Sequence, residues 1–376
     1  MSVITDLREF AHEIGVDLVG VASADSLPDA EEVMLNRIGD GLFGGLDWFT
    51  PARAQRACNP RLLLPSATSI ISFGVPYLVE PPIDRPGPGV PQGRISRYAW
   101  GEDYHEVLRE KIGSVVDFLK QRVSTDVRSR IFVDSGPLAE RAFAARSAIG
   151  WFGKNTNIIT RDFGSWLFLG EILVDIDLEC DRPLKKTCGT CEVCLKSCPT
   201  GAILSPYTVD NRRCISYLTI ELKGPIPREL RPLMGDRVFG CDACQEACPV
   251  NRKAQVRKRS LFGLLVDPFP DLIQLLMMSD EEYRTRFRAS PVHRAKKRGL
   301  QRNAAVALGN CGDPSAVLPL VEALGNEEEL VRGHAAWALG HLGGNRARKA
   351  LEMHRRRQDS PYVLAEIEDA LMVSGL

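Results

Sequence analysis

The chain has 376 residues, of which 44% are hydrophobic and 26% charged, and its basic and acidic residues are equal in number. This composition is that of a soluble globular protein, and the length predicts two or three domains. The N-terminus has no basic segment leading into an apolar run and no twin-arginine signal, and no apolar stretch is long enough to span a bilayer. We therefore expect a cytoplasmic protein with no membrane association.

Residues 1–180 alternate helical and strand-like segments. Apolar periodicity predicts an amphipathic helix over 7–14, and a second helix is expected over 138–148. Apolar runs predict four buried strands, at 17–22, 69–77, 130–134 and 165–176. This region is expected to be an α+β or α/β domain with a substantial core of its own.

Two residues of this region attract attention as polar groups next to predicted strands or loops. Asp134 ends the third strand, where ligand sites of open sheets gather, and among apolar walls its carboxyl group would have a raised pKa and could donate a proton. Capping of the following turn is the simpler explanation of the same residue. His105 closes a segment rich in polar aromatic residues, and a core or capping role is its default interpretation.

The segment from Gly150 to Thr156 has the appearance of a phosphate-binding loop but does not meet its requirements. Ala148 stands where the first glycine is needed, and Asn155 follows the lysine where Ser or Thr is needed. The chain also has no G-x-G-x-x-G fingerprint. We therefore expect electrons to enter from an external donor protein.

Residues 181–255 contain cysteines at the spacing of a bacterial ferredoxin, C-x2-C-x2-C-x3-C-P, followed by a second block C-x2-C-x3-C-P. In such proteins three close cysteines bind one 4Fe-4S cluster, and the cysteine before proline reaches the other cluster. One cluster would be held by Cys188, Cys191, Cys194 and Cys248. The second would be held by Cys198, Cys241, Cys244 and the intervening Cys214. Disulfides and a zinc ribbon fit this spacing less well.

Residues 256–376 are expected to be helical and contain a repeat. The sequence from Asn303 to Gly309 recurs 31 residues later, from His334 to Gly340, and each copy is expected near a helix start and before a second helix. Small Ala/Leu faces of this kind are typical of HEAT-like helix pairs. Between Arg284 and Arg302 the chain has eight basic residues and no acidic one, which indicates either a polyanion partner or a solvated face.

Four groups of motifs together resemble the epoxyqueuosine reductase family. They are Ser96-Arg97-Tyr98-Ala99 with Gly101, Asp103, Tyr104 and His105; Val133 to Pro137 continuing to Gly153-Lys154-Asn155; Cys198 to Ile203 leading to Arg213-Cys214 and on to Glu221; and Phe239 to Gln245. With the C-terminal HEAT-like pairs, the resemblance covers essentially the whole chain in the order of the family's domains.

The resemblance implies a nitroreductase-like, corrinoid-binding domain at 1–180, a ferredoxin-like module with two clusters at 181–255, and a HEAT-like tRNA-binding domain at 256–376. It implies base-off cobalamin, reduced by the two clusters, and conversion of epoxyqueuosine to queuosine at the wobble position of a tRNA anticodon stem-loop, with Asp134 as proton donor. The corrinoid would be contacted by Arg97, Ser216 and the backbone near Ile158. The tRNA phosphates would be contacted by Lys223, Arg228, Arg231, Arg284, Arg286, Lys297 and Arg298.

Other classes of protein share parts of this pattern. A reductive dehalogenase-like corrinoid enzyme would share the clusters but carries an export signal and lacks the helical tail. A simple electron carrier would have no use for the large N-terminal domain, and an RNA-binding adaptor would need no clusters. We expect the enzyme to act as a monomer.

Overall fold

The computed structural model describes residues 3–81, 89–123, 126–257 and 261–373. The chain divides into two compact units, each assembled from segments that are separate in the sequence. Unit 1 contains Met1–Glu80, Gly101–Arg212 and Ala243–Gly263, and unit 2 contains Pro81–Trp100, Arg213–Asp242 and Leu264–Leu376. The boundaries predicted near 180 and 255 do not coincide with these units, and the division into three functional domains stays a prediction.

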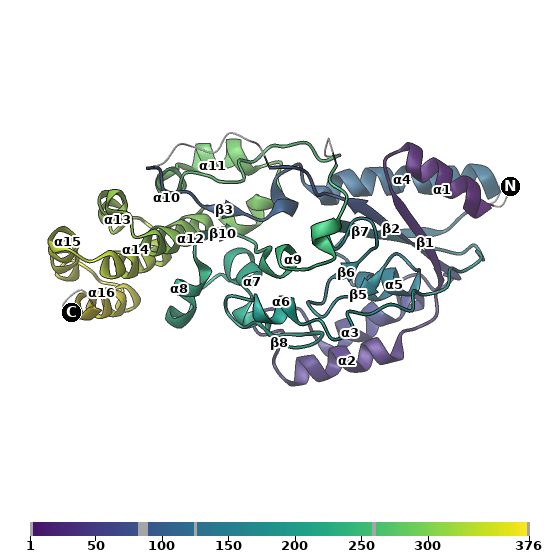
Figure 1. The fold of residues 1–376 in the computed structure, drawn as a ribbon, viewed down its shortest axis with the longest axis horizontal. Coiled ribbons are helices and arrows are strands. Elements are labelled where there is room, and N and C mark those ends of the chain that lie inside the picture. Colours follow the sequence, from purple (N-terminus) through teal and green to yellow (C-terminus); the bar gives the residue numbers. More distant parts are fainter. Residues whose placement is uncertain (1–2, 82–88, 124–125, 258–260, 374–376) are drawn as a thin grey trace. The chain divides into compact units, whose positions relative to one another are not determined.

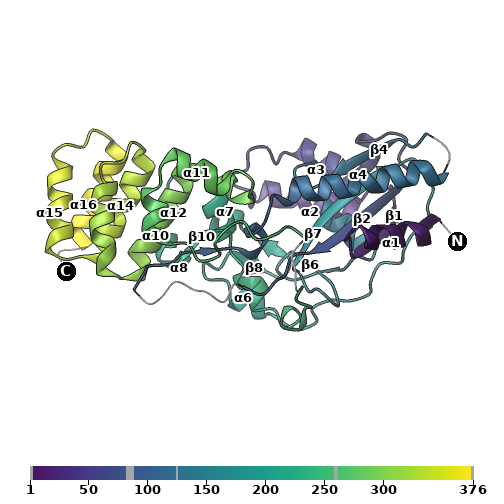
Figure 2. The same cartoon turned by 90° about the horizontal axis from the view of Figure 1, so that it is seen from above.

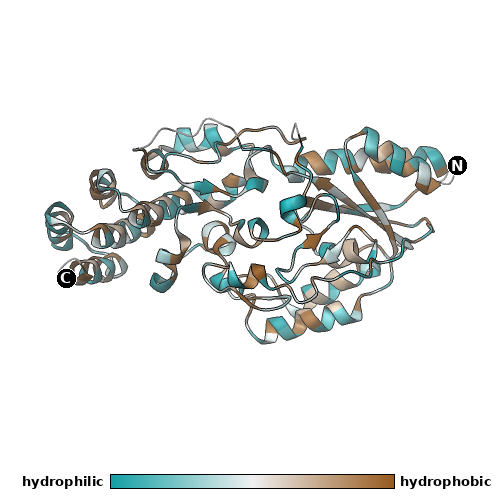
Figure 3. Ribbon diagram, in the orientation of Figure 1, coloured by the Kyte–Doolittle hydropathy of each residue, from teal (hydrophilic) through white to brown (hydrophobic). Residues whose placement is uncertain are grey.

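The core of unit 1 is a four-stranded antiparallel sheet in the order β1-β2-β7-β4. Its strands are β1 (Leu18–Ser23), β2 (Ser69–Pro76), β4 (Ser129–Phe132) and β7 (Leu167–Val174). The four apolar runs of the sequence correspond to these strands, so that prediction is confirmed. Every residue of β2 is buried, as expected of a strand covered on both faces, and Figure 3 shows the apolar character of the sheet.

Helices cover both faces of this sheet (Figure 1). One face carries α1 (Val3–Glu13) and α4 (Tyr104–Val123), and the other carries α2 (Pro28–Gly39), α3 (Pro51–Cys58) and α5 (Glu140–Arg146). Ile112 of α4 lies against Gly170 of β7, whereas Leu173 of β7 shares an apolar cluster with Phe143 of α5. Because successive side chains of a strand alternate between faces, Glu171 of β7 points to the α5 side.

The rest of unit 1 consists of short elements. A hairpin is formed by β5 (Trp151–Phe152) and β6 (Ile158–Ile159), and a second by β8 (Ile203–Ser205) and β9 (Thr208–Val209). Two single-turn helices, α6 (Val193–Lys196) and α9 (Ala243–Glu246), carry Cys194 and Cys244. Segments this short bury little apolar surface, which is consistent with a module that depends on bound clusters for its stability.

Unit 2 is mainly helical. Its long helices α12 (Lys296–Cys311), α14 (Glu329–Leu342) and α16 (Pro361–Val373) stack side by side, as Figure 2 shows. The shorter helices are α7 (Ile215–Ile220), α8 (Arg231–Met234), α10 (Leu272–Met277), α11 (Asp280–Phe287), α13 (Val317–Ala323) and α15 (Asn345–Arg355). Two short strands, β3 (Arg94–Ile95) and β10 (Arg237–Phe239), pair in parallel. No helix in the described parts of the chain is long and apolar enough to cross a membrane.

The predicted helix pairs are present, with one correction. The two copies of the repeat occupy the second halves of α12 and α14 and do not lie near the helix starts. Their final glycines are contact points between helices. A Cβ at Gly309 would lie 3.0 Å from the backbone of Ala338, and one at Gly340 would lie 2.6 Å from Ala370 of α16. The glycine that ends each copy of the repeat therefore allows neighbouring helices to pack closely.

Candidate functional site

Asp134 lies just beyond β4 in unit 1, with φ at +53°, a conformation uncommon for residues other than glycine. Its Oδ2 accepts a hydrogen bond from the Tyr104 hydroxyl (2.9 Å) and lies 3.3 Å from His105 Nε2. The other ring nitrogen of His105, Nδ1, lies 2.6 Å from Asp103 Oδ1. Tyr104 and His105, the first two residues of α4, therefore place their polar rings next to the end of β4.

His105 carries a positive charge in this arrangement. Burial alone would lower its pKa, but hydrogen bonds to Asp103 and Asp134, together with the charges of both carboxylates, raise the pKa of His105 to about 9. The surroundings of Asp134 differ from the apolar walls expected from the sequence, because its side chain is 52% exposed and contacts a histidine and a tyrosine. The acidic proton stored at neutral pH is on His105, beside the Asp134 carboxylate.

Two further acidic residues lie on the α5 side of the sheet, and one of them, Glu140, supports the Asp134 turn. Glu140, the first residue of α5, accepts a hydrogen bond from the Asp134 backbone N–H (2.5 Å). Burial, and next the negative charge of Asp134, raise the pKa of Glu140. Glu171 is fully buried, and neither of its carboxyl oxygens has a hydrogen-bond partner among the described residues. Burial also raises the pKa of Glu171 well above its usual value, so this carboxyl group is neutral.

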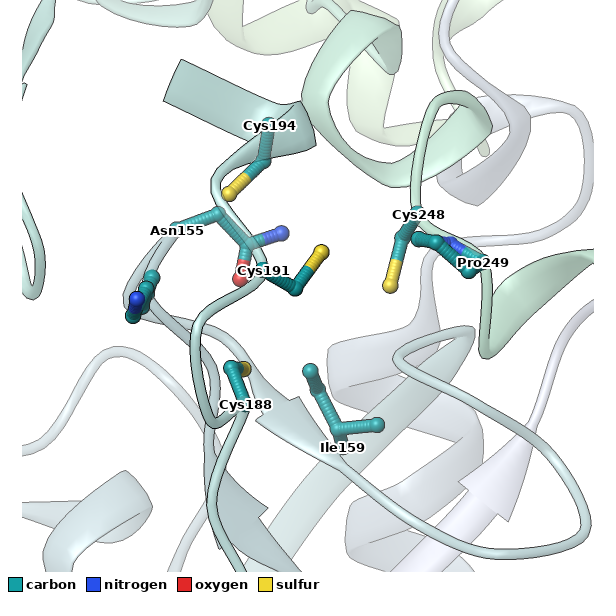
Figure 4. Close-up of a pocket in the computed structure, with 8 residues that line it drawn as sticks. Asn155, Ile159, Cys188, Cys191, Cys194, Cys248 and Pro249 are labelled. Atoms are coloured by element: carbon teal, nitrogen blue, oxygen red, sulfur yellow. The ribbon is translucent and has the colours of Figure 1, made fainter. Parts of the chain in front are cut away.

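Four of the predicted cluster ligands line a single cavity in unit 1. Cys188, Cys191, Cys194 and Cys248 surround one space together with Lys154, Asn155, Ile159 and Pro249 (Figure 4). All eleven cysteines of the chain lie among the described residues, and none of them is in a disulfide bond. In the described parts of the chain, no three His, Cys, Asp or Glu side chains converge on one metal ion. Four cysteines that surround one space without converging on a single point fit a polynuclear cluster better than a zinc ion, which needs four ligands at about 2.3 Å.

The other four predicted ligands are divided between the units. Cys198 and Cys244 belong to unit 1, and Cys214 and Cys241 belong to unit 2. Cys198 Sγ accepts a hydrogen bond from the Ala202 backbone N–H (3.2 Å), an environment suited to a thiolate ligand. The assignment of these four cysteines to one cluster remains a prediction.

The three residues predicted at the corrinoid are placed as follows. Arg97 is half-buried in unit 2, where its backbone N–H donates to Asp242 (2.8 Å) and its guanidinium lies over the Trp100 ring. Ser216 is half-buried in α7 of the same unit. Ile158 lies in β6 of unit 1 with its side chain buried, so only its backbone could offer a polar contact.

The predicted tRNA contacts fall into two groups. Lys223, Arg284 and Arg298 are exposed, and Arg286 is half-buried with its guanidinium over Phe287. The remaining three residues have acidic partners inside unit 2. Lys297 pairs with Asp280 (2.9 Å) and Glu327 (3.5 Å), and Arg228 pairs with Glu366 and Asp369.

For Arg231 the structure contradicts the predicted phosphate contact. Its side chain is only 1% exposed, and its guanidinium donates two hydrogen bonds of 2.8 Å to Glu366 and one of 2.9 Å to the Ile226 carbonyl. Arg302, which belongs to the basic run, is equally buried and donates to the Leu218 carbonyl (2.6 Å). These arginines attach loops to the helical stack and are not part of a basic surface.

Comparison with known proteins identifies the family. Residues 57–135 match the family described as epoxyqueuosine reductase QueG, residues 187–251 match a 4Fe-4S double cluster binding domain, and residues 293–372 match HEAT repeats. The chain is 40% identical to the epoxyqueuosine reductase of Escherichia coli K12, over 89% of this chain and 88% of that protein. It is 35% identical to that of Bacillus subtilis 168, over 99% and 96% of the two chains.

The chain belongs to the epoxyqueuosine reductase family. Its fold is also that of the family's solved structures. One, an epoxyqueuosine reductase with an epoxyqueuosine-modified tRNA-Tyr stem loop, superimposes with a TM-score of 0.93 at 34% identity, covering 100% of this chain and 99% of that one. Another, from Bacillus subtilis, has a TM-score of 0.92 at 34% identity, covers 99% and 98% of the chains, and is described with its own Asp134 catalytic loop swung out of the active site. The chain is an oxidoreductase that contains two 4Fe-4S clusters.

Three residues of this reductase that lie at or near the site in the structure were not predicted from the sequence. Glu140 was hidden within a predicted helix, although an acidic residue at the first position of a helix is a usual capping signal. Glu171 interrupts an otherwise apolar strand, and that interruption was the available signal. Asn155 was noticed only as a departure from a phosphate loop, yet it lines the cysteine cavity.

Proposed function

We propose that this chain reduces the epoxide of epoxyqueuosine at the wobble position of tRNA to the alkene of queuosine. The observation that carries the proposal is the grouping of Tyr104 and His105 around the Asp134 carboxylate, in the same unit as the four-cysteine cavity. Proton supply and electron supply are the two requirements of the reaction. An epoxide that accepts two electrons and two protons becomes an alkene and one molecule of water.

The protein residues supply and place the protons. Asp134 is exposed enough to reach a substrate oxygen, and His105 holds a proton at Nε2 next to Asp134 Oδ2. His105 passes its proton to the epoxide oxygen by way of the Asp134 carboxylate, and solvent supplies the second proton that the departing water needs. Tyr104 orients the carboxylate from above the Phe168 ring, from which its own ring is 4.2 Å distant.

The two clusters would supply electrons to the organic cofactor. Cys188, Cys191, Cys194 and Cys248 would hold one 4Fe-4S cluster, and Cys198, Cys214, Cys241 and Cys244 would hold the other. Arg97, Ser216 and the Ile158 backbone would hold cobalamin, which would supply a reductant stronger than any side chain. Arg97 and Ser216 are both half-buried, so a bound group can reach their polar atoms. The electrons come from an external donor protein.

The tRNA anticodon stem-loop meets the exposed cations Lys223, Arg284 and Arg298, with Arg286, Lys297 and Arg228 available after rearrangement of their partners. A base in a single-stranded loop can be turned out into a pocket, which suits chemistry on a wobble nucleoside. Nothing in this scheme requires a second copy of the chain, and we propose that the enzyme acts as a monomer.

An anaerobic turnover assay tests the function. Protein with both clusters intact is incubated with epoxyqueuosine-containing tRNA and a chemical reductant, with cobalamin present or omitted, and the nucleosides are analysed by mass spectrometry. Loss of one oxygen atom only in the presence of cobalamin is the expected result. No conversion by fully loaded protein would refute the proposal and direct attention to halogenated small molecules.

A further inference from the structure

The turn between β5 and β6 carries the Gly153-Lys154-Asn155 motif that fails as a phosphate loop. The turn is closed by hydrogen bonds from the Gly153 N–H to the Asn157 carbonyl (2.8 Å) and from the Thr156 N–H to the Gly153 carbonyl (2.9 Å). Asn155, at its tip, is only 5% exposed. A buried amide side chain in a tight turn needs partners for both its oxygen and its nitrogen.

The two ends of the Asn155 amide have different surroundings. Oδ1 accepts a hydrogen bond from the Asn157 backbone N–H (3.4 Å), which orients the amide. A Cβ at position 153 would lie 2.5 Å from this oxygen, so glycine is needed there to leave room for it. Nδ2 is buried and has no hydrogen-bond partner among the described residues. Leaving a buried donor unpaired costs about 1–3 kcal/mol, which indicates that a bound group accepts from it.

The residues that line the cavity beside Asn155 Nδ2 indicate which bound group would accept its hydrogen bond. Asn155 lines the same space as the four cysteines Cys188, Cys191, Cys194 and Cys248. Figure 4 shows its amide nitrogen directed into the space between the cysteine side chains. Lys154, the other polar residue of the cavity wall, already has an acidic neighbour in Glu192 (4.0 Å). Asn155 is thus a neutral donor aimed at the place where cluster sulfur atoms would lie.

We propose that Asn155 Nδ2 donates a hydrogen bond to a sulfur of the cluster held by Cys188, Cys191, Cys194 and Cys248, and so raises the reduction potential of that cluster. The physical reason is that a reduced cluster carries one more negative charge, so an N–H donor stabilises the reduced form more than the oxidised form. The inference rests on the assignment of these four cysteines to one cluster, proposed above. Asn155 is a positioning and tuning residue and transfers no electron or proton itself.

Redox titration of Asn155→Leu, followed by electron paramagnetic resonance without tRNA or cobalamin, tests the proposal. We expect the full iron content of two clusters and a midpoint potential lowered for one cluster only. A tenfold change in the equilibrium for reduction corresponds to 59 mV for a one-electron couple. Asn155→Asp keeps the oxygen that accepts from Asn157 and replaces the donor by a negative charge, so its potential should fall further. Asn157→Ala, outside the cavity wall, is the matched control and should leave both potentials unchanged.

Unchanged potentials in fully loaded Asn155→Leu and Asn155→Asp would overturn the proposal. If both variants lose iron, the hydrogen bond is tested on the wild-type protein by isotope labelling. With ¹⁵N introduced at asparagine side chains, the reduced cluster should show a nitrogen hyperfine coupling that Asn157→Ala retains, and absence of this coupling would also overturn the proposal. Because none of these measurements involves tRNA or cobalamin, a negative result leaves the proposed reaction untouched.

Discussion

Replacing Arg231 by methionine tests whether this arginine is structural, as its surroundings indicate, or a tRNA contact. The guanidinium is 1% exposed and Glu366 is 4% exposed, and three hydrogen bonds of 2.8–2.9 Å leave with the side chain. Glu366 would remain buried, and Arg228, at 3.2 Å, would be the cation left beside it among the described residues. Removing one partner of a buried ion pair costs about 3–5 kcal/mol, so we expect the opening equilibrium of the helical stack to rise by roughly 10²- to 4 × 10³-fold.

Hydrogen–deuterium exchange followed by mass spectrometry measures the opening of the helical stack peptide by peptide, without assuming that the whole chain unfolds in one step. Peptides from α14 and α16 should lose protection by that factor, whereas peptides from the sheet of unit 1 should not change. In the double variant Arg231→Met with Glu366→Leu, which leaves no unpaired charge, we expect much of the protection to return. Unchanged protection together with weaker, less salt-dependent tRNA binding would refute the structural role and restore Arg231 as a phosphate contact.

Four further predictions concern the site and the tail. Asp134→Asn should abolish turnover while iron and cobalamin content stay at wild-type levels, and undiminished turnover would remove Asp134 from the mechanism. Because burial raises the pKa of Glu140 to about 8, the folded protein keeps a proton that the unfolded chain releases above about pH 4.5, and stability should fall as pH rises from 4.5 to 8. In urea titrations, the free energy of unfolding of Glu140→Gln should fall less over this pH range than that of the wild-type protein. Equal pH dependence of the two proteins would show that Glu140 does not cause the fall. Neutralising the exposed Lys296 and Arg298 should weaken tRNA binding and reduce its salt slope by about 2, whereas an unchanged slope would mean a solvated face. Gly340→Ala should destabilise the helical stack by about 1–3 kcal/mol, since its Cβ would lie 2.6 Å from α16, and wild-type exchange protection there would show that the helices can adjust.

Much of the organisation of this reductase could be read from the chain alone. The cysteine spacing predicted two clusters, since cluster ligation depends on a short sequence pattern that survives without knowledge of the fold. The apolar runs predicted all four strands of the sheet, and the repeat predicted stacked helix pairs. Each of these features is local, with a period or spacing imposed by backbone geometry or by thiol chemistry.

The electrostatics of the site depended on long-range packing. His105 and Asp134 are 29 residues apart in the sequence, and only the packing of α4 against the sheet brings them together. The Asp134 carboxylate therefore lies beside a charged histidine and not among the apolar side chains that the sequence suggested. A run of basic residues cannot reveal which members are buried, and Arg302 proved to be an internal anchor. Asn155 acquired a meaning only when the hairpin placed its amide beside the cysteines. The sequence by itself determined which chemical groups the protein has and how its segments are patterned. The tertiary structure decided their charge, exposure and partners, because burial and contact are properties of residues brought together from distant parts of the chain.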